Sequence, residues 1–287
     1  MIIDRKTNNK EELKSGGFQK FLINNFFGRL LLKLICRRFI SKLMGAFLNT
    51  RFSKLKIKKF IKTANINVDE YEVDNIKSYN AFFTRKIKDG ARDIDYNENH
   101  FISPCDSKLS IYDINEDSIF SIKDSYYKVN DLVLDQELVK EYIGGKALVF
   151  RLAVGDYHRY CYPDSGTKNK NKHIKGVLYT VSPIIYGKYN IFKRNSREYT
   201  ILNTNHFGKI VMVEVGATLV GKIKNNHLDE YEFKKAEEKG YFEFGGSTIV
   251  LLIKNNIKLD EDLLINSKNG DETIVKYGEK IGELVTD

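Results

Sequence analysis

The stretch YFEFGGSTIVLLI, residues 241–253, decides how the rest of the chain is interpreted. Apolar side chains alternate with others at its start, and a run of branched apolar residues follows, which predicts a buried β-strand. Gly245, Gly246 and Ser247 interrupt that strand at its centre. Because glycine weakens a strand and packs no side chain, the interruption indicates either a β-bulge or a functional site.

The surrounding sequence divides into two parts. Short β-like runs separated by turn residues begin at about residue 99, with one helix predicted at 129–143. The earlier part has a helical pattern, including a helix in 79–95 that is expected to end at Asp89 and Gly90. We therefore predict an α+β protein with an N-terminal basic amphipathic helical module (1–95) and a β-rich catalytic core (96–287).

Charge is concentrated in the first part. Residues 1–60 contain 15 Lys and Arg against 3 Asp and Glu, whereas the remainder contains 32 against 35. Such a segment favours an anionic partner, either a phospholipid surface or a nucleic acid. The three cysteines form no CxxC pair, so neither a disulfide framework nor a metal site is expected.

Residues 18–48 are predicted to form a helix that lies in a membrane interface. They contain no run of about 18 apolar residues, so a membrane-spanning helix is not expected. An interfacial helix needs an apolar face and a cationic face, although a core helix with solvated lysines would give a similar pattern. The candidate apolar residues are Phe21, Phe26, Phe27 and Leu31, and the candidate cations are Arg29, Lys33, Arg37, Arg38 and Lys42.

Three polar residues in separate stretches are candidates for chemistry. Asp106 lies in SPCDSKLS (103–110), and His158 lies in VGDYHRYCYPDSG (154–166). Together with Ser247 they supply the acid, the imidazole and the hydroxyl of an activated serine. A single histidine is more often a packing or hydrogen-bonding residue, and the residues alone leave both interpretations open.

Five elements, in order along the chain, resemble the phosphatidylserine decarboxylase family. FGGSTIVLLI is similar to the family's LGST-type self-processing motif, with the Gly-Ser pair intact and Gly245 where leucine is usual. The other four similar elements are NAFFTRKIKDGARDI, SPCDSKL, GDYHRYCYPDSG and HFGKIVMVEVGATLVGKI. Together with the basic segment before them they cover nearly the whole chain, and five ordered elements are more specific than any one alone.

The resemblance implies a self-processing enzyme. The hydroxyl of Ser247 attacks the carbonyl of Gly246, and autocatalytic cleavage gives chains 1–246 and 247–287 that stay associated. Ser247 becomes a covalent pyruvoyl cofactor, with His158 as the base and Asp106 as the group that orients it. The implied reaction converts phosphatidylserine to phosphatidylethanolamine and CO2 at an anionic membrane surface, with the protein peripheral on the cytoplasmic face of the cell membrane. No metal and no nucleic-acid partner are implied.

One departure from the family concerns the base. The family's DYHRxH element commonly has two histidines, whereas here the second position is Cys161. Either Cys161 replaces the second imidazole, or His158 performs both tasks. A cysteine acts as a base only when its pKa is lowered, so we favour His158.

Other functions fit parts of the sequence. A pyruvoyl-dependent decarboxylase of a soluble amino acid would not need the basic apolar segment. A nucleic-acid-binding protein would use that segment, but no known nucleic-acid-binding signature appears. A non-catalytic lipid-binding relative would explain Cys161 as a sign of lost processing.

Overall fold

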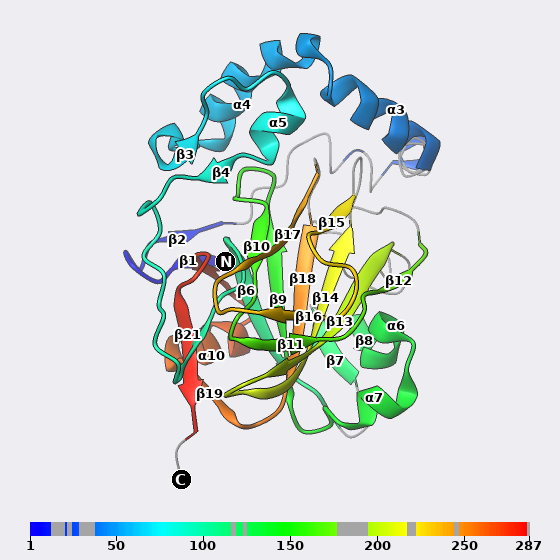
Figure 1. Cartoon of the computed structure of the whole chain (residues 1–287), viewed down its shortest axis with the longest axis vertical. Coiled ribbons are helices and arrows are strands. Elements are labelled where there is room, and N and C mark those ends of the chain that lie inside the picture. Colours follow the sequence, from blue (N-terminus) through cyan, green and yellow to red (C-terminus); the bar gives the residue numbers. More distant parts are fainter. Residues whose placement is uncertain are drawn as a thin grey trace.

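The computed structural model of this chain describes most of its length. The described residues are 1–12, 21, 25–28, 38–115, 119–122, 125–176, 195–216, 222–243 and 247–285. Within them a sheet-rich body lies below a group of helices at one end of the molecule (Figure 1). The predicted α+β class is therefore confirmed. Of the predicted interfacial helix at 18–48, residues 18–20, 22–24 and 29–37 lie outside the described residues, and 38–48 are helical.

A large sheet forms the centre of the body. Neighbouring strands in it are antiparallel, except that β1 runs parallel to β20. In spatial order the sheet contains β16 (Tyr231–Phe233), β11 (Gly166–Lys168), β13 (Arg197–Thr204), β14 (Gly208–Gly216), β18 (Ser247–Ile253), β9 (Lys146–Leu152), β6 (Ser107–Asp113), β20 (Glu272–Val275), β1 (Ile2–Asp4) and β2 (Lys10–Glu11), with β12 (Lys172–Ile174) paired to β13.

Smaller sheets accompany the large one. The first contains β10 (Arg159–Cys161), β17 (Glu238–Phe242) and β15 (Ile223–Asn225), and the second contains β19 (Ile257–Leu259), β21 (Lys280–Leu284) and β5 (His100–Ile102). Two short ribbons are formed by β3 (Tyr71–Glu72) with β4 (Lys86–Ile87) and by β7 (Ile119–Ile122) with β8 (Ser125–Lys128).

The helices of the described residues from Arg38 onward lie in three groups. The N-terminal group contains α3 (Arg38–Leu48), the 3-10 helix η1 (Arg51–Lys56), α4 (Ile57–Ala64), the 3-10 helix η2 (Val68–Glu70) and α5 (Tyr79–Phe83). Two short helices, α6 (Val129–Val133) and α7 (Gln136–Lys140), cover one face of the large sheet. The last, α10 (Glu261–Lys268), packs Leu263 against the other face.

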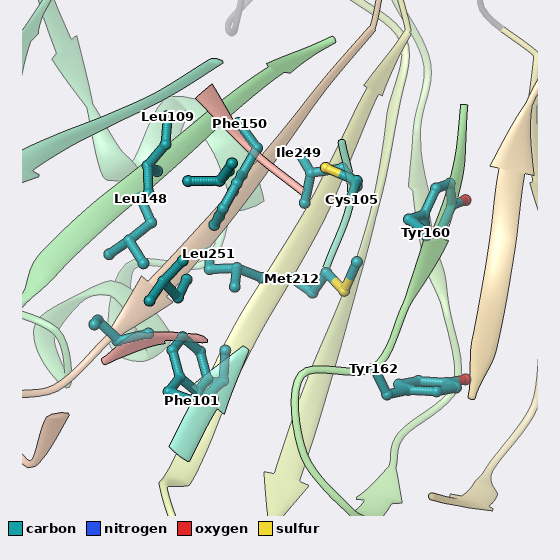
Figure 2. Close-up of a cluster of buried hydrophobic side chains, with 14 of the residues drawn as sticks. Phe101, Cys105, Leu109, Leu148, Phe150, Tyr160, Tyr162, Met212, Ile249 and Leu251 are labelled. Carbon is teal, nitrogen blue, oxygen red and sulfur yellow. The ribbon is translucent and has the colours of Figure 1, made fainter. Parts of the chain in front are cut away.

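Strand β18 is the central apolar strand of the protein. All seven of its residues are buried, because both faces of the large sheet are covered. Val250 and Leu252 pack beneath α6 and α7, whereas Ile249 and Leu251 lie in the opposite cluster drawn in Figure 2. Each such side chain contributes about 1.5–3 kcal/mol of transfer free energy. The strand is therefore held firmly along its length.

The single interrupted strand predicted at 241–253 is instead two strands in different sheets. β17 ends at Phe242 and pairs with β10 and β15, whereas β18 begins at Ser247 and lies between β14 and β9. Residues 244–246 are outside the described residues. The predicted break is real, but it falls where the chain passes from one sheet to another, and Ser247 is the first residue of its strand.

Two predicted helices are shorter than expected. The helix in 79–95 ends at Phe83, and β4 follows before Gly90 takes a left-handed conformation at φ 75°. The helix at 129–143 is broken at Leu134, whose φ of 53° also lies in the left-handed region. Asp135 then caps α7, accepting a hydrogen bond from the Leu138 backbone N–H at 3.1 Å.

Candidate active site

Ser247 and His158 lie side by side in the structure. The Oγ atom of Ser247 is 3.3 Å from Nδ1 of His158. Both side chains are buried, with at most 1% of their surface exposed. Ser247 is aligned with Leu152 of β9 and Gly216 of β14, and His158 directly precedes β10. Two candidates from distant stretches are thus in contact, at the edge between two sheets.

A backbone carbonyl sets the tautomer of His158. Its Nε2 lies 3.0 Å from the carbonyl oxygen of Ala153, which can only accept a hydrogen bond. Nε2 therefore carries the proton, and Nδ1 presents a lone pair to the Ser247 hydroxyl. The Ala153 carbonyl is held by a tight turn, since it also accepts a hydrogen bond from the Asp156 backbone N–H at 3.0 Å. Asp156 Oδ2 in turn accepts one from the Ala153 N–H at 2.6 Å.

The imidazole is neutral over the ordinary pH range. Burial lowers the pKa of His158 from 6.5 to about 4, and the nearby positive charges of Arg85 and Lys108 act in the same direction, while Asp156 opposes them. A neutral imidazole with a free Nδ1 can accept a proton. The contact therefore has the geometry and the protonation state of a base beside a nucleophile.

Asp106 makes its hydrogen bonds elsewhere. Its carboxylate accepts hydrogen bonds from Arg92 Nη2 at 2.9 Å and from the Tyr277 backbone N–H at 2.8 Å, and Lys276 Nζ lies 3.5 Å away. Burial alone would raise the pKa of Asp106, but the charges of Lys276 and Arg92 hold it below its ordinary value. Among the described residues no hydrogen bond joins Asp106 to His158. The group that orients the imidazole is the Ala153 carbonyl, in place of the predicted carboxylate.

Cys161 has the properties of a buried thiol. It packs with Ile102 and Ala236, and its Sγ lies 3.9 Å from the carbonyl oxygen of Ser103. Burial raises the pKa of Cys161 to about 12, so the thiolate is not available near neutral pH. These surroundings favour His158 over Cys161 as the base.

The sequence reasoning missed the group that covers the imidazole. The ring of Phe83, at the end of α5, stacks on His158 with 4.1 Å between ring centroids and 29° between planes. Phe83 belongs to the family-like element NAFFTRKIKDGARDI, but the letters of that element do not indicate which residue it contacts. Gly246, the other predicted processing residue, lies outside the described residues.

Among the described residues, no group of three or more His, Cys, Asp and Glu side chains is arranged to hold a metal ion. No described helix combines the length and apolar character needed to cross a bilayer.

Ser247 is buried, faces an oriented neutral histidine and begins a strand that follows a Gly-Gly step. These features define a candidate self-processing serine site. Comparison with known proteins identifies the family: residues 79–283 match the family model described as phosphatidylserine decarboxylase. The chain belongs to that family.

Curated relatives span nearly the full length of the chain. It is 50% identical to phosphatidylserine decarboxylase proenzyme 2 of Clostridium acetobutylicum, over 95% of this chain and 94% of that protein. It is 42% identical to the phosphatidylserine decarboxylase proenzyme of Fusobacterium nucleatum, over 98% of this chain and 96% of that protein. It is 39% identical to the phosphatidylserine decarboxylase proenzyme of Ruminiclostridium cellulolyticum, over 99% of this chain and 97% of that protein. All three relatives are named as proenzymes.

Proposed function

We propose that this chain is a proenzyme that cleaves itself between Gly246 and Ser247 and then decarboxylates phosphatidylserine to phosphatidylethanolamine and CO2. The observation that carries the proposal is the contact of Ser247 Oγ with Nδ1 of His158, at the Gly-Ser pair of the family motif. Family membership and the names of the relatives support the same reaction.

His158 is the base of the cleavage step. As Ser247 Oγ bonds to the carbonyl carbon of Gly246, its proton moves to Nδ1. The imidazolium that forms keeps the hydrogen bond from its Nε2–H to the uncharged carbonyl oxygen of Ala153. The bond between the Gly246 carbonyl carbon and the Ser247 nitrogen then breaks, and Nδ1 gives the proton to the departing nitrogen, so the amide becomes an ester and residue 247 has a free amine. Loss of the Cα proton of residue 247 then drives elimination, which breaks the Cβ–Oγ bond and leaves a carboxylate on Gly246. Water adds to the resulting dehydroalanine in its imine form and releases the nitrogen as ammonia.

A pyruvoyl group at position 247 fits the residues around it. Ser247, from which it would form, is buried and is the first residue of a buried strand. Its hydroxyl faces a neutral base. When present, the group supplies an electron-withdrawing carbonyl that accepts the electron pair released as a substrate carboxylate leaves as CO2. Nδ1 of His158 would take the proton that the substrate amine loses and then return it beside residue 247, while the apolar side chains of Leu152 and Ile249 help to exclude water.

The two chains would remain together because their strands interleave. β18, in residues 247–287, lies between β14 and β9, and β20 lies between β6 and β1, so each has a partner from residues 1–246 on both sides. The main-chain hydrogen bonds and the apolar clusters of these strands do not depend on the peptide bond at 246–247.

The anionic membrane surface is the proposed partner of the N-terminal region, 1–95. Phe52 and Leu55 of η1 are 79% and 86% exposed, and Phe26 and Phe27 are exposed as well. Residues 43–68 contain no Asp or Glu. The exposed cations of η1 and α4 are Arg51, Lys54, Lys56, Lys58, Lys59 and Lys62. An apolar surface ringed by cations suits a peripheral site on the cytoplasmic leaflet. Arg29, Leu31, Lys33 and Arg37, predicted for the same role, lie outside the described residues.

The activity is tested with vesicles in which the serine carboxyl of phosphatidylserine is isotopically labelled. The purified full chain is expected to release labelled CO2 and form phosphatidylethanolamine, and to release none from free labelled serine. The Ser247→Ala variant, which cannot form the cofactor, is expected to be inactive. Release by Ser247→Ala, or turnover of free serine in preference to the lipid, would overturn the proposal.

A further inference from the structure

The N-terminal helices reach the candidate base through one aromatic ring. Phe83 is fully buried and stacks on His158 at 4.1 Å between centroids. The same ring belongs to a separate apolar cluster with Leu48, Ile57 and Tyr79. Phe83 therefore joins the packing of the helical group to the imidazole, although the two lie 75 positions apart in the sequence.

Hydrogen bonds hold the backbone on both sides of Phe83. After α5, the carbonyl of Thr84 accepts from Arg159 Nε and Nη2 at 2.9 and 2.8 Å, and Arg85 Nη2 donates to the carbonyl of Gly155 at 3.3 Å. Before it, the Tyr79 backbone N–H donates to the Ser53 hydroxyl at 2.8 Å. Arg159 directly follows His158, and Gly155 lies in the turn that holds the Ala153 carbonyl. The segment with Phe83 is thus tied to the same loop as the base.

We propose that Phe83 is a positioning residue for the self-cleavage reaction: its ring holds the imidazole of His158 in the orientation in which Nδ1 faces Ser247. This inference rests on the proposed function. The Ala153 carbonyl restrains one edge of the imidazole, and a stacked ring restrains its face. Without the ring, rotation about the Cβ–Cγ bond would move Nδ1 away from the hydroxyl and Nε2 away from its acceptor. Water would also reach the imidazole.

The first test measures self-cleavage of the full chain made by cell-free translation. Phe83→Leu keeps an apolar side chain but removes the stacked ring, and a displaced base is expected to slow cleavage about 10- to 100-fold. Phe60→Leu is the matched control: Phe60 lies in the same helical cluster, and its ring partners are Tyr79 and Phe82. An unchanged rate in Phe83→Leu, or equal slowing in Phe60→Leu, would contradict the proposal.

The second test does not depend on activity. In the Ser247→Ala full chain, nitrogen NMR of labelled histidine reports the tautomer and the titration of His158. With Phe83 present, we expect proton on Nε2 and a pKa far below 6.5, as burial requires. With Phe83→Leu, we expect a mixture of tautomers and a pKa closer to 6.5. The neighbouring charges of Arg85, Lys108 and Asp156 stay the same in both variants, so they do not explain a difference.

The two tests separate this inference from the proposed function. If Phe83→Leu does not fold, the spectrum of Ser247→Ala alone decides: an Nδ1-protonated ring, or a pKa near 6.5, would reject a positioned base. If the tautomer behaves as expected while Ser247→Ala still cleaves, the proposed function fails and the positioning role of Phe83 on the imidazole stands.

Discussion

Ser247 and His158 contribute different things to the proposed chemistry. The serine supplies the oxygen, and its place as the first residue of β18 fixes where that oxygen lies. The histidine supplies a lone pair on Nδ1, and the Ala153 carbonyl fixes which nitrogen that is. Cys161 is three residues further along, but its thiol faces the Ser103 carbonyl and has a raised pKa.

The assignment of the base predicts opposite results for two neighbouring substitutions. His158→Ala is expected to slow self-cleavage at least about 100-fold, because general bases contribute about 10²- to 10⁴-fold. Cys161 is not ionised, and Cys161→Ser replaces it with a side chain of similar size. This variant is expected to cleave itself at close to the rate of the unsubstituted chain. Gel analysis of freshly translated chains measures both. Cleavage by His158→Ala together with its loss in Cys161→Ser would reverse the assignment.

The pKa of His158 predicts how cleavage depends on pH. Only the neutral imidazole accepts the proton, and burial keeps it neutral until the pH falls to about 4. The rate is therefore expected to stay nearly level from pH 8 to pH 5.5 and to fall at lower pH, with circular dichroism confirming that the chain remains folded. An exposed histidine would lose half its rate near pH 6.5, and that midpoint would contradict the buried site.

The sequence was informative about which residues matter and less so about how they are oriented. Ser247 and His158 could be predicted because each lies in a motif. The Ala153 carbonyl could not, since the direction of a backbone carbonyl depends on the turn that contains it. Asp106 shows the same limit: its motif marked it as important, but its partners Arg92 and Tyr277 come from segments that only the fold brings together.

At the scale of elements, alternation of apolar residues predicted strands well but not their sheets. The letters of 241–253 are compatible with one strand, and only the pairing of β17 with β10 and of β18 with β14 and β9 separates them. Strand β1 was missed altogether. The residues around Ile2–Asp4 are mostly polar and show no strand pattern, yet these three pair with β20 because that strand offers a free edge. Local pattern contains no information about such a distant partner.

This pairing predicts that residues 1–11 help to retain the smaller chain. β1 binds along β20, and Arg5 forms ion pairs with Asp260, Asp262 and Glu279, all in residues 247–287. When residues 1–11 are removed from the cleaved protein, the chain 247–287 is expected to dissociate at a lower denaturant concentration. Size-exclusion chromatography measures this release. The same truncation in Ser247→Ala controls for general loss of stability. Equal release with and without residues 1–11 would show that β1 plays no part.

The whole molecule places apolar and cationic side chains at one end and the candidate site close to it. Figure 1 shows α3, α4 and α5 together over one end of the sheets, and α5 ends at the residue that stacks on His158. The resulting arrangement would bring a lipid headgroup near Ser247 while the protein rests on the bilayer. The excess of Lys and Arg in residues 1–60 favours an anionic partner for this end, and that remains a prediction.

Charge reversal tests the membrane-facing end. If this end faces an anionic surface, Lys54, Lys58 and Lys62 would each add about 1 kcal/mol of attraction, so changing all three to Glu is expected to abolish flotation with phosphatidylserine vesicles. The matched control changes the exposed lysines Lys170, Lys234 and Lys268 of the body, with the same change in net charge. Equal loss in both variants would indicate a general charge effect and not a defined membrane-facing surface.

The most direct test of the central claim is the intact mass of the purified full chain. The account predicts two polypeptides, residues 1–246 and 247–287. The smaller is expected to be lighter by one ammonia than the same peptide with an N-terminal serine, and to have no free amino terminus. Ser247→Ala is expected to give one uncleaved chain. A single intact chain from active protein, or a cut at any other peptide bond, would contradict the account.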